Sequence, residues 1–243
     1  MRWLRILLIC GLIVCSLGSC KLVNQPVVKG SGNVITETRE VANFQRVSIK
    51  GIGTLILQQG SQESLTIEGD DNILTLIDAT VQAGTLEIGP SNVKLKPSKS
   101  LTYTLALKNL DELHILGAIN TQSGLLKGEG LTVTINGASN LTLAGVELES
   151  ATMTINGVGK IEIESGQLNE QAVTINGTGQ YTAANVKTQK ATVKINGTGK
   201  ATVWSERTLD VGINGTGTVS YYGSPVVSQR VAGVGKVKSL GAK

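Results

Sequence analysis

The sequence predicts an all-β fold, a parallel β-solenoid with rungs of about 20 residues. Three observations predict it: a tripeptide that recurs at nearly constant spacing, alternation of apolar and polar residues around it, and the composition. The chain has 30 glycines but only one Phe, two Trp and four Tyr among its 243 residues. The rest is rich in Val, Ile, Leu and Thr, which suit a pleated, half-buried surface.

The tripeptide Ile-Asn-Gly occurs five times, and successive asparagines are 20, 20, 20 and 18 residues apart. The repeated asparagines are Asn136, Asn156, Asn176, Asn196 and Asn214. Degenerate copies end at Gly117 and Gly233, and most copies continue as Gly-x-Gly. Because Gly and Asn tolerate positive φ, this corner reads as a turn between two strands.

Apolar residues alternate with polar ones on both sides of the corner, which places one face of each strand inside. Before the corner, the predicted interior columns are Val133, Met153, Val173, Val193 and Val211, and Ile135, Ile155, Ile175, Ile195 and Ile213. After it, they are Leu141, Ile161, Tyr181, Ala201 and Val219, and Leu143, Ile163, Ala183, Val203 and Tyr221.

Two topologies can use this pattern, an antiparallel meander and a parallel solenoid. Near-identical copies at constant spacing favour stacking, because asparagine ladders and aliphatic columns form only where like residues meet. The five repeated asparagines are therefore expected to form a structural ladder along one corner. Their amides can bond one another and the backbone of the corner.

We expect residues 41–243 to form a single domain. Its N-terminal part, up to about residue 110, is β-rich without the regular copy, so we expect wider rungs that cap the solenoid. At the other end, the basic tail with Lys236, Lys238 and Lys243 would guard the open sheet edge against strand addition.

The first 19 residues are typical of a signal peptide. Arg2 and Arg5 precede nine apolar residues, Ile6 to Val14, a run too short to cross a membrane, which needs roughly 20. The following Leu17-Gly18-Ser19-Cys20 resembles the lipobox of bacterial lipoproteins, which implies acylation of Cys20 and attachment to a membrane. Residues 20–40 would then be the lipidated cysteine and a linker. The sorting rule for such lipoproteins implies that Lys21 directs the protein to the outer membrane.

Composition excludes several classes of function. All three cysteines lie in the first 20 residues, so none remains for a disulfide in the mature chain. The formal charge of +4 falls to +2 without Arg2 and Arg5, and the charges are dispersed, which argues against nucleic acid. The only histidine, His114, offers neither a catalytic triad nor a metal site.

Positions directly after the repeated glycines carry no carboxylate, which argues against a calcium-binding repeat. They are Asn140, Lys160, Gln180, Lys200, Thr218 and Lys236. No cofactor or metal is expected.

The copies of Ile-Asn-Gly-x-Gly, preceded by Phe44-Gln45-Arg46-Val47-Ser48-Ile49-Lys50-Gly51 and Gly84-Thr85-Leu86-Glu87-Ile88, resemble the head GIN domain family over nearly all of residues 44–240. The resemblance implies a right-handed parallel β-helix, export, an adhesion-type role and no catalytic residues. The sequence shows no heptad stalk, so the lipid would serve as the anchor.

We therefore expect a non-enzymatic binding module of the cell envelope, with a glycan or an envelope protein as partner. The alternatives are a periplasmic scaffold and, less favoured, a β-helical polysaccharide-degrading enzyme. Trp204 and Tyr222 are candidate ligand-binding residues, because alternation turns both outward on neighbouring rungs, where two aromatic rings could stack on a sugar. The competing interpretation is that they pack under the tail.

Overall fold

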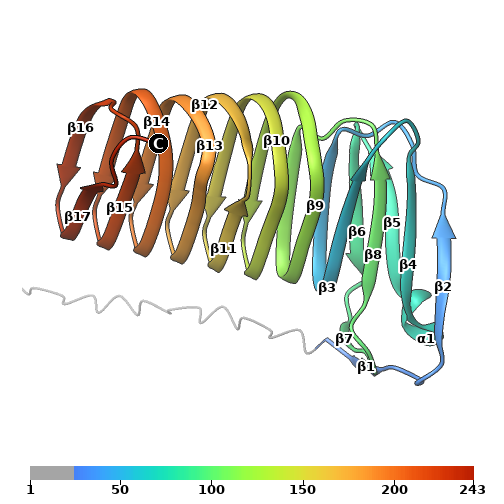
Figure 1. The fold of residues 1–243 in the computed structure, drawn as a ribbon. Coiled ribbons are helices and arrows are strands. Elements are labelled where there is room, and N and C mark those ends of the chain that lie inside the picture. Colours follow the sequence, from blue (N-terminus) through green and yellow to red (C-terminus); the bar gives the residue numbers. More distant parts are fainter. Residues whose placement is uncertain (1–24) are drawn as a thin grey trace, which may run out of the picture.

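A computed structural model describes residues 25–243 as a column of stacked coils, closed at its N-terminal end by a smaller group of strands (Figure 1). Strands make up 74% of the structure and helices 2%, and the column has about 6 turns, about 20 residues apart. The predicted parallel β-solenoid is confirmed. The expected signal peptide, Cys20 and the first residues of the expected linker lie outside the described residues.

Nine strands build the column, and each pairs in parallel with its equivalents in the neighbouring coils. They are β9 (Glu112–Ile135), β10 (Ala138–Ile155), β11 (Val158–Ile163), β12 (Gly166–Ile175), β13 (Thr178–Ile195), β14 (Thr198–Ile213), β15 (Thr216–Tyr222), β16 (Val226–Val231) and β17 (Val234–Ser239). The register follows the repeat: Leu141 of β10 lies opposite Thr121 in the preceding coil and Ile161 in the next. Equivalent residues therefore form continuous columns along the axis.

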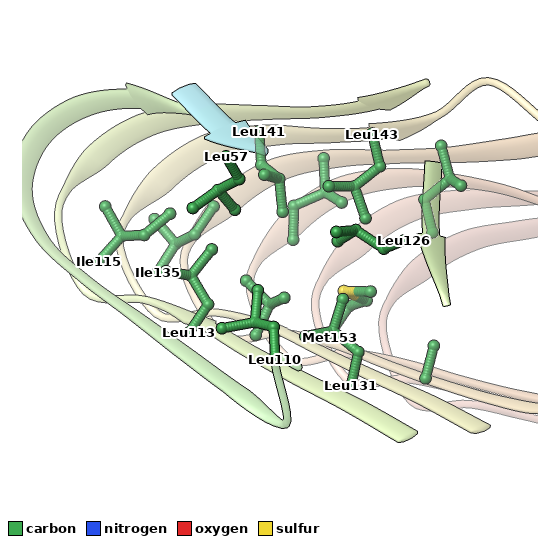
Figure 2. Close-up of a cluster of buried hydrophobic side chains, with 14 of the residues drawn as sticks. Leu57, Leu110, Leu113, Ile115, Leu126, Leu131, Ile135, Leu141, Leu143 and Met153 are labelled. Carbon is green, nitrogen blue, oxygen red and sulfur yellow. The ribbon is translucent and has the colours of Figure 1, made fainter. Parts of the chain in front are cut away.

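The predicted interior columns line the core of the column. Figure 2 shows Leu141 and Leu143 on one side of the interior and Ile135 and Met153 on the others, with their side chains converging. Met153 is fully buried. Tyr221 differs, because it lies near the open end of the column and is only partly buried.

The glycines and asparagines at the corner were expected because they tolerate positive φ, and this expectation was wrong. Neither the five asparagines nor the glycines that follow them have positive φ. A Cβ on Gly157, Gly177 or Gly197 would instead clash with the carbonyl oxygen of the corresponding glycine one coil earlier. Glycine is required here because successive coils approach closely at this corner, not because the backbone turns through the left-handed region.

The N-terminal cap contains eight strands and one helical turn. They are β1 (Val27–Lys29), β2 (Val34–Arg39), β3 (Arg46–Gln59), β4 (Ser64–Asp70), α1 (Asp71–Leu74), β5 (Ile77–Gln82), β6 (Thr85–Pro90), β7 (Lys94–Lys96) and β8 (Thr102–Leu107). β3 joins the cap to the column, since it pairs in parallel with β9 from Arg46 to Leu57.

The cap only partly matches the expected wider rungs. Beyond β3, the sheet continues through β8 to β4 and β2, and both β4–β8 and β2–β4 are antiparallel. β5 also pairs antiparallel with β6. The prediction of continued rungs was wrong for these strands, because the segments that form them carry no copy of the repeat that could stack in parallel. The antiparallel strands cover the end of the interior.

The segment expected to be a linker, residues 20–40, contains strands in its described part. β1 pairs with β7, and β2 forms the edge of the large sheet. Asp70 ties this segment down, because its buried carboxylate accepts hydrogen bonds from the backbone of Gly32 and Ser98, both at 2.8 Å, and from the Ser98 hydroxyl at 2.5 Å. The bond from the Ser98 hydroxyl is the main reason that the pKa of Asp70 is lowered.

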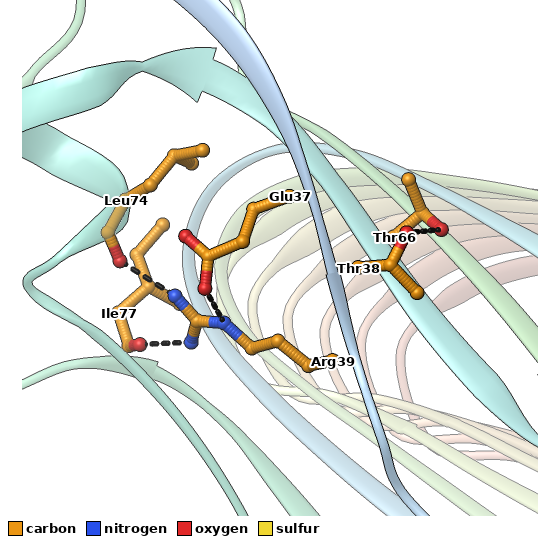
Figure 3. Close-up of polar contacts among 6 residues, drawn as sticks. All are labelled: Glu37, Thr38, Arg39, Thr66, Leu74 and Ile77. Atoms are coloured by element: carbon orange, nitrogen blue, oxygen red, sulfur yellow. Dashed lines mark hydrogen bonds and ion pairs between the residues drawn. The ribbon is translucent and has the colours of Figure 1, made fainter.

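Arg39 holds the cap together from the edge strand. Its guanidinium donates to the carbonyl oxygens of Leu74, at 2.7 Å, and Ile77, and it pairs with Glu37 at 3.0 Å (Figure 3). The two carbonyls belong to the segment around the end of α1. A single side chain thus satisfies backbone acceptors that no strand ladder reaches.

Two buried tyrosines differ in their hydrogen bonding. The Tyr181 hydroxyl donates to the Gln171 side chain at 2.9 Å, and the Gln171 amide donates to the Thr188 hydroxyl. The Tyr103 hydroxyl, in the cap, has no hydrogen-bond partner among the described residues. Burial raises the pKa of both phenols, that of Tyr103 to about 12.

Candidate functional site

The asparagines of the repeat form one continuous row of side-chain hydrogen bonds along the column. Each Nδ2 donates to the Oδ1 of the asparagine one coil earlier, over 2.8 Å for Asn156, 2.7 Å for Asn176, 2.8 Å for Asn196 and 3.0 Å for Asn214. The side chains are exposed. This row stiffens one corner and lies beside a concave surface that extends along the column.

That surface is a groove of about 840 Å³ that runs along the column across six successive coils. Three residues of each coil line it. The first wall consists of Ala138, Val158, Thr178, Thr198, Thr216 and Val234, the floor of Ser139, Gly159, Gly179, Gly199, Gly217 and Gly235, and the second wall of Asn140, Lys160, Gln180, Lys200, Thr218 and Lys236. Five steps of about 4.8 Å give a length of about 24 Å. We call this surface the glycine-floored groove.

The floor is low because the glycine positions point inward and the core leaves no room for a side chain there. A Cβ on Gly199 would lie 3.1 Å from the Cδ1 of Ile175, and a Cβ on Gly217 would lie 2.9 Å from the Cδ1 of Ile195. The residues before and after each glycine point outward and form the walls. The inward-pointing position between them, glycine in five of the six coils and Ser139 in the other, forms the floor.

The second wall carries the charge of the groove. Lys160 forms an ion pair with Glu162 at 2.6 Å, while Lys200 and Lys236 make no ion pair within residues 25–243. No acidic residue lines the groove. In the sequence these positions argue only against calcium, although lysine recurs among them at every second coil.

The aromatic pair lies on another part of the surface. Trp204 and Tyr222 are register partners on neighbouring strands, and both are half-buried. The Nζ of Lys243, from the tail, lies 4.7 Å from the centre of the Tyr222 ring and 5.5 Å from that of Trp204. The Trp204 indole donates to Glu206 at 2.7 Å. Lys243 therefore lies over both rings, and the Nζ of Lys187 also lies 5.7 Å from the centre of the Trp204 ring.

The only histidine of the sequence lies on the surface beside one carboxylate. His114 lies 3.3 Å from the Glu112 carboxylate, with both side chains well exposed. Residues 25–243 contain no group of three or more His, Cys, Asp or Glu side chains suited to a metal ion. Within the same range, no helix has the length and apolarity to span a bilayer.

A family model described as "Putative auto-transporter adhesin, head GIN domain" matches residues 43–225. The chain belongs to the head GIN domain family. The resemblance drawn from the repeats is confirmed by this match. The comparison with curated proteins gives no match.

Solved structures share the fold of this head GIN domain. A "putative adhesin" from Bacteroides fragilis NCTC 9343 is 24% identical with a TM-score of 0.82, covering 88% of this chain and 100% of its own. A "putative adhesin" from Parabacteroides merdae ATCC 43184 is 22% identical with a TM-score of 0.69, over 88% and 99%. A "putative lipid binding protein" from Parabacteroides distasonis ATCC 8503 is 21% identical with a TM-score of 0.72, also over 88% and 99%.

Proposed function

We propose that this head GIN domain is a non-enzymatic, lipid-anchored binding module of the cell envelope that holds an extended glycan along the glycine-floored groove. The family label supports an adhesion-type role at the envelope. The observation that carries the proposal is the groove itself, since it is straight, open and lined by equivalent residues in six coils.

The chemistry of the groove suits a polymer of repeating units. Each coil offers the same kinds of group in nearly the same place, a small or β-branched residue on one wall and a polar side chain on the other. A small ligand would gain nothing from six equivalent places, whereas a polymer can occupy several together and gain from multivalency. Threonine hydroxyls and side-chain amides can bond sugar hydroxyls.

Anchorage by an acylated Cys20 agrees with the placement of the groove. The described chain enters the cap at β1, while the groove lies on the solenoid beyond β9 (Figure 1). A lipid attached upstream of β1 would hold the cap near the membrane and leave the groove accessible. The outer membrane is the proposed location, on the basis of Lys21.

The test is binding of the protein to immobilised envelope polysaccharides. Thr198→Trp would place an indole in the groove, and Thr174→Trp, on a neighbouring outward face, is the matched control. Retention should fall at least tenfold for Thr198→Trp and stay unchanged for Thr174→Trp, with the same β-sheet circular dichroism. Equal binding by wild type and Thr198→Trp would refute the role of the groove. Co-purifying envelope proteins without glycan binding would favour the scaffold alternative.

The aromatic pair is a second candidate contact, because two adjacent rings already hold a cation in the structure. We propose that Lys243 is displaced when a sugar stacks on Trp204 and Tyr222. Binding should then weaken in Trp204→Ala and Tyr222→Ala, and it should strengthen in Lys243→Ala. No change in any of the three would assign the pair to packing under the tail.

A further inference from the structure

The polar wall of the glycine-floored groove alternates between charged and neutral side chains. Along the column the register runs Lys160, Gln180, Lys200, Thr218 and Lys236, each residue opposite the next on adjacent strands. Lysine therefore recurs at every second coil. Two steps of about 4.8 Å place successive lysines about 9.6 Å apart.

Two of these lysines, Lys200 and Lys236, give the groove positive charge that no acidic side chain of residues 25–243 pairs with. The residues that line it include no Asp or Glu, and only Lys160 has an acidic neighbour, Glu162, at 2.6 Å. Lys200 and Lys236 are exposed. An anionic ligand would thus meet cations at regular intervals, separated by the neutral hydrogen-bonding groups of Gln180 and Thr218.

We propose that the groove selects an acidic polysaccharide that carries one carboxylate on every second sugar. The proposal rests on the glycan-binding function above and specifies its ligand. In an extended chain of pyranoses, each sugar advances by a length close to one strand spacing. An acid on alternate sugars then meets successive lysines, while the intervening sugars face Gln180 and Thr218.

Other linear polyanions fit the spacing less well. An extended peptide advances about 3.3 Å per residue, so lysines about 9.6 Å apart would meet every third residue. Because side chains alternate between the two sides of such a peptide, acids three apart point in opposite directions. A nucleic-acid strand carries a phosphate about every 3.4 Å, far denser than these lysines, and the groove has no aromatic residue for base stacking.

The opposite wall fits the same ligand. Val158, Thr178, Thr198, Thr216 and Val234 are short, so the sugar ring can lie close to the floor beside them. Val158 and Val234 are 60% and 75% exposed and leave apolar surface for the face of a pyranose.

The experiment measures the affinity of the whole protein, purified in mild detergent, for three oligosaccharides of equal length by calorimetry. The probes are a hyaluronan octasaccharide with a carboxylate on every second sugar, an octagalacturonate with one on every sugar, and neutral chitooctaose. Hyaluronan should bind at least tenfold tighter than chitooctaose. Octagalacturonate should bind no tighter than hyaluronan, in spite of its doubled charge.

Two triple variants test whether the lysines of the groove bind the carboxylates of the ligand. The triple change Lys160→Gln, Lys200→Gln and Lys236→Gln should weaken hyaluronan binding by about tenfold and should remove most of its salt dependence. Most of this loss comes from Lys200 and Lys236, which are exposed and unpaired within residues 25–243, because Glu162 already pairs with Lys160. The control carries the same charge loss outside the groove, by Lys127→Gln, Lys190→Gln and Lys194→Gln, and should bind like wild type.

The outcomes separate this inference from the function on which it rests. If Thr198→Trp blocks binding of every probe but the groove triple variant behaves like the control, glycan binding in the groove stands and selection of alternating acid is refuted. Binding that rises with charge density, tightest for octagalacturonate, also refutes it. If no probe binds, and Thr198→Trp changes nothing on envelope polysaccharides, the proposed function fails as well.

Discussion

The hydroxyl group of Tyr181 tests whether the polar network inside the column contributes to stability. It donates to Gln171 over 2.9 Å in a fully buried setting, and Gln171 in turn donates to Thr188. Tyr181→Phe keeps the ring and leaves the Gln171 oxygen unpaired. A buried acceptor without its donor costs about 1–3 kcal/mol, so the free energy of unfolding should fall by about 2 kcal/mol.

Tyr103→Phe is the matched control, since it removes a buried hydroxyl that has no partner among the described residues. Its free energy of unfolding should stay unchanged or rise by a few tenths of a kcal/mol, because a desolvated hydroxyl contributes nothing favourable. Urea unfolding followed by circular dichroism measures both variants. At about 2–4 °C per kcal/mol for a domain of this size, Tyr181→Phe should lower the melting temperature by about 4–8 °C. Equal effects of the two changes, or a larger loss for Tyr103→Phe, would refute the reasoning.

Three further predictions concern the corner, the cap and the anchor. Gly177→Ala should destabilise the protein by about 3 kcal/mol in urea unfolding, because its Cβ would clash with a carbonyl oxygen of the preceding coil, whereas Gly60→Ala, in open space, should change little. The stability that Asp70 contributes should be complete above pH 3.8 and lost as the pH falls through its lower folded-state pKa. Ser98→Ala should shift that loss to higher pH in acid-unfolding curves, and an unshifted curve would contradict the assignment. Cys20→Ser should abolish incorporation of radioactive palmitate and release the protein from the membrane fraction, and continued labelling would remove Cys20 as the lipidated residue.

Much of the column could be predicted from the sequence because each coil repeats the chemistry of the last. Where Val173 lies beside Met153 and Val193, the same alternation determines the interior of three coils at once. Parallel stacking then follows from the constant spacing, and the family resemblance rests on the same copies.

The cap could not be predicted in this way, because its strands have no copies, and β2, β4 and β8 pair with strands that are not their neighbours in the sequence. The pairing of β2 with β4, and the bonds from Arg39 to Leu74 and Ile77, join residues 26 to 38 positions apart without any periodic signal. The contact between Lys243 and Trp204 could not be predicted either, since the two residues are 39 positions apart in the sequence. Alternation predicts which way a side chain points but not what lies over it.

The glycine-floored groove was missed for a different reason. Its floor depends on glycines that point inward against isoleucines of a neighbouring coil, a close approach that spacing alone does not indicate. The lysines of its wall were visible in the sequence, but only the parallel register shows that Lys160, Lys200 and Lys236 lie in a single row.

Because successive coils share the same corner, the length of the groove can change by whole coils. Duplicating one 20-residue unit would extend the wall of hydroxyl, amide and amine groups by a single strand spacing and leave every existing contact between coils intact. Loss of a unit would shorten it equally. Unequal recombination within the repeated DNA could therefore adjust the number of sugars held, and with it avidity, without a new recognition surface having to arise.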